Sequence, residues 1–295
     1  MNRKRQLLPS GETLAYFEQG SGEETLVLIH GNLSSSLYWE PLLKRLPATI
    51  RVVAPDLRGF GDSSYVHRFD SLLELAEDVQ ALLDALKIER FHLVGWSLGG
   101  GVAMELAAKL VSRVKTLTLL SSTTHKGYPL FQKDENKKPI YGLVYSSKDA
   151  MAEDPVQVKP VLDALKNDNS ALMSWIYDVT IYTGKKPEPD DNNRWIKETM
   201  KMRCLVDADW ALANLNMSEE LGYYQPGNGR IRKITAKVLH LWGFLDKTVP
   251  EYMLLDNATA LKGLSSVVRW DQCGHSPLVD KTDELTQTLL DFIQN

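Results

Sequence analysis

The sequence has few cysteines, no long apolar run and little excess charge. Its 295 residues include two cysteines, Cys204 and Cys273, outside any C-x-x-C motif, so we expect no disulfide framework and a reducing, cytoplasmic setting. The first residues lack the apolar segment of a secretory signal, and apolar runs such as Leu26–Ile29 are far shorter than the roughly 18 residues that span a bilayer. A formal net charge of −4 offers no basic surface for nucleic acid or an anionic membrane.

Metal-ligand clusters and phosphate-binding motifs are missing as well. No set of His, Cys, Asp and Glu has the spacing of a metal site, so we expect neither a metal nor another cofactor. The glycines of Gly59–Ser63 are not accompanied by G-x-G-x-x-G or by Gly-Lys-Ser/Thr. We therefore interpret this stretch as a turn that holds the ends of strands together.

The composition and the pattern of apolar residues indicate a globular α/β protein. Hydrophobic residues make up 43% and charged residues 24%, which permits a large core. Strands are expected at 6–8, 13–17, 25–30, 51–56, 91–96, 114–120, 238–242 and 265–270, and helices at 35–46, 71–86, 99–110, 252–261 and 282–293. Ser71 is a plausible N-cap. Alternation of buried strands with amphipathic helices predicts a parallel, doubly wound sheet.

The alternation stops between residues 123 and 231, where helical patterns and polar loops dominate. We expect residues 1–122 and 232–295 to form the core and residues 123–231 to form a helical cap over a binding pocket. Trp175, Tyr177 and Trp210 of this insertion are candidate substrate-binding residues. The alternative is that these rings form the internal core of the cap.

The strongest chemical signal is Gly95-Trp96-Ser97-Leu98-Gly99, a G-x-S-x-G sequence between a buried strand and a helix rich in Gly and Ala. Such a sharp strand–turn–helix exposes the serine hydroxyl above the sheet, and a Cβ at either glycine would clash with neighbouring elements. The sequence therefore predicts Ser97 as a nucleophile. The alternative is a helix N-cap after a tight turn.

A serine nucleophile needs a base and a carboxylate that orients the base. Of six histidines, His92 and His240 lie within apolar strands, and His67 and His125 lie in polar segments. His275 follows the last strand and Asp246 follows the preceding one, so both should lie at the carboxyl edge of the sheet beside Ser97. The order Ser97, Asp246, His275 is the order expected for this arrangement.

An oxyanion needs two preorganised N–H donors. Leu98, the residue after the nucleophile, should supply one backbone amide at the helix start. The loop His30–Ser36 should supply the other, most simply the amide of Asn32.

Together these motifs resemble the α/β-hydrolase fold superfamily, with His30-Gly31, Asp56–Ser63, Gly95–Gly100, Asp246 and Gly274-His275 as the matching segments. The resemblance implies a mostly parallel eight-stranded sheet, a helical cap after its sixth strand and a serine hydrolase mechanism. Gly95–Gly100 looks like the corresponding sequence of pimeloyl-ACP methyl ester esterases, and His30–Ser36 is similar to loops of some acyl-homoserine lactone hydrolases.

The function expected is hydrolysis of a carboxylic ester of a small or medium apolar substrate through an acyl-enzyme. A lactonase with the same triad, a carbon–carbon bond hydrolase and a cofactor-free haloperoxidase or perhydrolase are alternatives. A ligand-binding sensor with slow turnover is an alternative of another class. The expected partner is a small-molecule ester or lactone, without nucleic acid or a membrane span.

Overall fold

Strands and helices alternate in the two parts of the chain that flank the insertion. The computed structural model describes residues 3–294, and the outermost residues of the predicted core, 1–2 and 295, lie outside this range. The strands are β1 (Arg3–Leu7), β2 (Thr13–Gln19), β3 (Glu24–Ile29), β4 (Ile50–Pro55), β5 (Phe91–Trp96), β6 (Val114–Leu120), β7 (Phe131–Lys133), β8 (Pro139–Val144), β9 (Lys237–Gly243) and β10 (Ser265–Trp270). The helices are α1 (Glu40–Leu43), α2 (Leu72–Ala85), α3 (Leu98–Lys109), α4 (Lys148–Ala152), α5 (Lys159–Lys166), α6 (Ser170–Thr180), α7 (Pro189–Thr199), α8 (Leu205–Asn214), α9 (Glu251–Ala260), α10 (Pro277–Asp280) and α11 (Thr282–Gln294). Two short 3₁₀ helices are η1 (Ser36–Trp39) and η2 (Arg230–Lys233).

Eight of these strands form one sheet in the order β1-β2-β4-β3-β5-β6-β9-β10. β2 runs antiparallel to β1 and to β4, and every other neighbouring pair is parallel. The sheet expected from the sequence is thereby confirmed. Because β3, β5, β6, β9 and β10 run in the same direction, the loops that follow them meet at one edge of the sheet.

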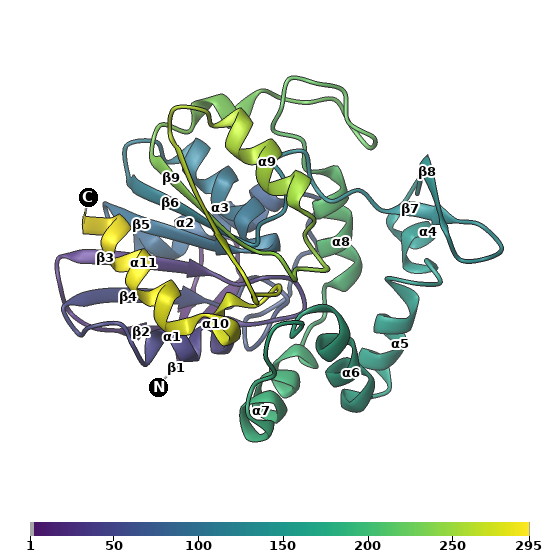
Figure 1. Ribbon diagram of the computed structural model, residues 1–295, viewed down its shortest axis with the longest axis horizontal. Coiled ribbons are helices and arrows are strands. Elements are labelled where there is room, and N and C mark those ends of the chain that lie inside the picture. Colours follow the sequence, from purple (N-terminus) through teal and green to yellow (C-terminus); the bar gives the residue numbers. More distant parts are fainter. Residues whose placement is uncertain (1–2, 295) are drawn as a thin grey trace.

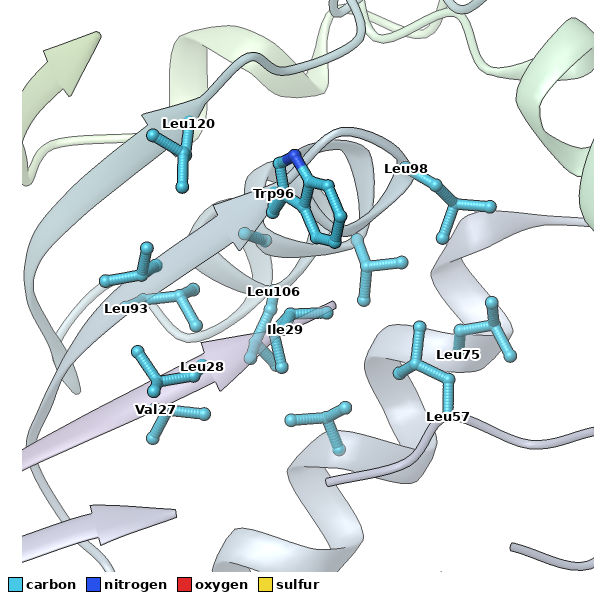
Figure 2. Packing of buried hydrophobic residues seen from close by; sticks show 14 of the residues in the cluster. Val27, Leu28, Ile29, Leu57, Leu75, Leu93, Trp96, Leu98, Leu106 and Leu120 are labelled. Atoms are coloured by element: carbon cyan, nitrogen blue, oxygen red, sulfur yellow. The ribbon is translucent and has the colours of Figure 1, made fainter. Parts of the chain in front are cut away.

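The centre of the sheet is buried on both faces. All four residues of Leu26–Ile29 in β3 have no exposed surface, although alternate side chains point to opposite faces. Side chains of β3, β5, α2 and α3 belong to one apolar core, part of which Figure 2 shows. α2 begins with the capping box of Ser71 and Glu74, which confirms the predicted N-cap. The core therefore holds the strand ends at the carboxyl edge in fixed positions.

The insertion between β6 and β9 contains α4 to α8 and also the β7–β8 hairpin. In Figure 1 the hairpin, α4 and α5 lie at the right of the view, and α6 and α7 lie at the bottom. The hairpin departs from the expected mixture of helices and loops. Its second strand carries exposed apolar residues, including Tyr141 at 82% exposure, so no buried face produced a recognisable strand pattern in the sequence. The helix expected at 35–46 is shorter and consists of η1 followed by α1.

Candidate active site

The turn at Ser97 joins β5 directly to α3. Ser97 has φ 56° and ψ −120°, in a region that residues with a side chain rarely adopt. A Cβ on Gly95 would overlap the carbonyl oxygen of Gly99, and one on Gly99 would overlap the carbonyl oxygens of Ile29 and His30. The two glycines thus allow the strand, the turn and the helix to approach closely enough for the sharp turn to form.

Backbone hydrogen bonds hold this unusual conformation. The Ser97 N–H donates to the carbonyl of Leu120 over 3.0 Å, and the Ser97 carbonyl accepts from Gly100 at 2.9 Å and from Thr123 at 3.2 Å. A conformation of this kind costs about 1–3 kcal/mol and persists where the surroundings determine it. The rest of the fold therefore stabilises the orientation of the serine side chain.

His275 and Asp246 form a buried pair at the same edge of the sheet. The His275 Nδ1 lies 3.0 and 2.9 Å from the two carboxylate oxygens of Asp246. Oδ1 of Asp246 also accepts hydrogen bonds from the backbone N–H groups of Thr248 and Val249, each at 2.8 Å. With its Nδ1–H donated to Asp246, the imidazole has Nε2 available to accept a proton.

Ser97 and His275 line one cavity of about 510 Å³. Within residues 3–294 the imidazole of His275 is hydrogen-bonded to Asp246 and not to the serine hydroxyl, and such contacts often tighten only when substrate binds. Most of the wall is apolar, with contributions from Leu33, Trp96, Leu98, Leu130, Val156, Val161, Ile176, Val179, Ile181, Leu205, Leu212 and Val249. The cavity can hold a small or medium apolar group beside the two side chains.

Asn32 and Leu98, the two predicted sources of oxyanion N–H donors, also belong to this site. Both residues line the cavity, and in the described part of the chain neither N–H has a hydrogen-bond partner. Leu98 is the first residue of α3, where backbone N–H groups have no partner within the helix. The loop that carries Asn32 is held at Asp56, whose Oδ1 accepts the N–H of Ser36 at 2.7 Å. These two N–H groups are available to stabilise negative charge on a bound molecule.

The three predicted aromatic residues of the insertion lie in different surroundings. Trp175 and Tyr177 line the cavity, with Trp175 60% exposed and Tyr177 buried. Trp210 does not belong to the cavity wall, and its ring packs edge-to-face against Tyr224 with 5.7 Å between centroids. The structure therefore brings two of these residues, Trp175 and Tyr177, to the site.

Asp209 is a polar residue of the cavity that the sequence analysis missed. It lies on α8 with Leu205 and Leu212, which line the same cavity. Burial raises the pKa of Asp209 to about 7, against the effect of the hydrogen bond from the Asn32 amide, while the charge of Asp154 raises it further. An acidic residue at helical spacing from two leucines was the signal in the sequence.

The remaining histidines lie in other parts of the fold. Burial lowers the pKa of His30, His92, His125 and His240, in the last case to about 4, so these rings are neutral at pH 7. His125 is buried although its segment is polar in sequence, whereas the side chain of His67 is 61% exposed. None of these rings lines the cavity that contains Ser97.

Comparison with known proteins identifies the family to which the chain belongs. A family model described as the alpha/beta hydrolase fold matches residues 24–150. The dihydrolipoyllysine-residue acetyltransferase component of the acetoin cleaving system of Pseudomonas putida is 41% identical over 289 residues, which cover 96% of this chain and 67% of that protein. The chain belongs to the α/β-hydrolase fold family.

Other known proteins match over nearly the whole chain. The pimeloyl-[acyl-carrier protein] methyl ester esterase of Vibrio atlanticus is 27% identical over 289 residues, covering 96% of this chain and 99% of the relative. The esterase EaEST from Exiguobacterium antarcticum superposes with a TM-score of 0.74 at 20% identity, with 99% of both chains covered. Among residues 3–294 no helix is long and apolar enough to cross a membrane, and no group of three or more His, Cys, Asp and Glu is placed to hold a metal ion.

Proposed function

We propose that the protein is a serine hydrolase that cleaves carboxylic esters of small or medium apolar substrates through an acyl-enzyme. One observation carries the proposal. Ser97, held at φ 56°, opens into the same cavity as His275, whose Nδ1 contacts the Asp246 carboxylate at 2.9 Å. A serine on a strained turn, a buried imidazole and a buried carboxylate are the three groups that acyl transfer through serine requires.

In the proposed mechanism the Ser97 hydroxyl oxygen attacks the ester carbonyl while Nε2 of His275 accepts its proton. Asp246 stabilises the imidazolium, and the N–H groups of Leu98 and Asn32 stabilise the oxyanion. The imidazolium then gives its proton to the leaving alkoxide, and the alcohol departs. Water attacks the acyl-enzyme with His275 as base, which releases the acid and restores the serine.

The cavity supports an apolar acyl or alcohol group. Its volume of about 510 Å³ lies within the range of roughly 300–1,000 Å³ that is usual for small-molecule sites. Its wall is mostly apolar, with Asp209, Lys247 and Gln157 among its polar side chains. We therefore expect a preference set by chain length and shape.

The test combines labelling with a substrate series. A fluorophosphonate probe should label Ser97, as located by peptide mapping, and a chain-length series of p-nitrophenyl esters together with a panel of lactones should identify the preferred substrates. Ser97→Ala should remove labelling and lower kcat by about 10⁴–10⁶-fold while the melting temperature stays near that of the wild type. Full activity in pure Ser97→Ala protein, or labelling at another serine, would refute the assignment.

The kinetic form of the reaction separates the proposed activity from the alternatives. Repeated turnover of linear esters supports an esterase. A single slow burst with the acyl group retained on Ser97 would contradict it and favour a sensor. Turnover restricted to lactones would show that the substrate is a cyclic ester, cleaved by the same three side chains.

A further inference from the structure

Three helices of the insertion converge on the loop that follows β3. The Asn32 side-chain amide donates to Oδ1 of Asp209 on α8 over 2.8 Å. The carbonyl of Leu33 accepts from the hydroxyl of Thr199, at the end of α7, over 2.6 Å and from the hydroxyl of Tyr177 on α6. These partners are 177, 166 and 144 residues away in sequence, so the contacts exist only when the insertion is folded onto the core.

The backbone of this loop is itself unusual. Leu33 has φ 52°, although it is not glycine, and its N–H donates to Oδ1 of Asn32 over 3.0 Å. The side chain of Asn32 thus joins Asp209 on one side to the Leu33 backbone on the other. A left-handed leucine persists where surrounding contacts determine it, and here those contacts come mainly from the insertion.

Stability alone does not account for Asp209. In the part of the chain that the structure describes, its carboxyl receives one hydrogen bond, from Asn32, and the residue lies between Leu205 and Leu212 in the cavity wall. A carboxyl with so few partners in an apolar wall is unfavourable. Asp209 is partly buried in this wall, and its pKa is raised to about 7. Groups retained at such a cost are often functional.

We propose that Asp209 is a positioning residue, which fixes the candidate oxyanion N–H of Asn32 through the Asn32 side chain. In this arrangement the helices of the insertion position a group of the site in addition to covering the cavity. This inference rests on the proposed function, because the orientation of the Asn32 N–H matters only if an oxyanion forms beside Ser97. Since the oxyanion exists in the transition state and not in the bound ester, the effect should fall on kcat and leave KM nearly unchanged.

The experiment is a double-mutant cycle between residues 209 and 32. Asp209→Leu keeps the branching at Cγ but removes the acceptor, Asp209→Asn keeps an acceptor oxygen of the same size, and Asn32→Ala removes the linking side chain but keeps the backbone N–H. For each variant and for the Asp209→Leu/Asn32→Ala double variant, kcat and KM are measured on one p-nitrophenyl ester. Rates are divided by the concentration of sites that a fluorophosphonate titrates, so partial unfolding does not imitate a loss of kcat.

We expect Asp209→Leu to lower kcat per titrated site by about 10- to 100-fold, somewhat less than the 10²–10³-fold that loss of an oxyanion donor costs. Asp209→Asn should stay within about 3-fold of the wild type, and the double variant should be no slower than Asn32→Ala alone. The inference fails if kcat per site is unchanged in Asp209→Leu, or if the two single effects multiply. If the wild type neither turns over esters nor labels at Ser97, the proposed function itself fails.

Discussion

Replacing Asp209 by asparagine should stabilise the protein at neutral and alkaline pH and leave its stability unchanged at about pH 4. Burial raises the pKa of this carboxyl in the folded protein to about 7 from an ordinary value of 3.8. Between these values the folded state keeps a proton that the unfolded state has lost. Because the folded state then binds more protons, the free energy of unfolding of the wild type falls as pH rises through this window, and it levels off above it. The asparagine side chain does not ionise, so the variant does not lose this stability as pH rises.

The size of the effect follows from the difference between the two pKa values. A difference of about 3 corresponds to about 4 kcal/mol, which is an upper bound because Asp209 borders a cavity that water can enter. We expect about 2–4 kcal/mol at pH 8. At roughly 2 °C per kcal/mol for a chain of this size, Asp209→Asn should melt about 4–8 °C above the wild type.

The assay is thermal unfolding of both proteins from about pH 4 to pH 9 at constant ionic strength. Asp163→Asn, which removes an exposed carboxylate on α5, is the matched control for the change in net charge. The difference between Asp209→Asn and the wild type should grow with pH and then reach a plateau. A difference that is independent of pH, or one that grows toward acid, would refute the reasoning.

Gly99→Ala should lower the free energy of unfolding by more than about 3 kcal/mol, because its Cβ would overlap two backbone carbonyl oxygens. A melting temperature within about 2 °C of the wild type would contradict this close approach. Trp175→Ala should reorder kcat/KM across the ester chain-length series with little change in melting temperature, since the exposed ring lines the cavity and such contacts contribute about 1–3 kcal/mol per methylene. Trp210→Ala should instead lower the melting temperature and keep the order, because its ring packs against Tyr224. The opposite pattern in these two variants would show that their surroundings have been assigned wrongly.

Much of the sheet and the meeting of His275 with Asp246 could be predicted from local patterns. Asp246 follows β9 and His275 follows β10, and parallel neighbouring strands bring their carboxyl ends together. The partner of Asp209 and the hairpin could not be found in this way. The bond from Asn32 to Asp209 spans 177 residues, and the exposed β8 strand has no buried face to create an alternating pattern. The contact of Asp209 with Asn32 depends on how the insertion folds onto the core, which the helical spacing of Asp209 with Leu205 and Leu212 does not encode.

The positions of strained backbone conformations give an independent indication of where the candidate active site lies. Among the described residues seven that are not glycine have positive φ, and four of them, Leu33, Ser97, Ser121 and Gln272, follow the ends of β3, β5, β6 and β10. Each such residue costs about 1–3 kcal/mol, which glycine would largely avoid. At Ser97 glycine would remove the hydroxyl that the proposed reaction needs. At Leu33 a glycine would allow the loop to adopt other conformations. The hydrogen bonds from α6, α7 and α8 would then have to restrain a more flexible segment. The strained residues at this edge of the sheet are therefore consistent with a site in which the fold fixes both the side chains and the direction of the backbone.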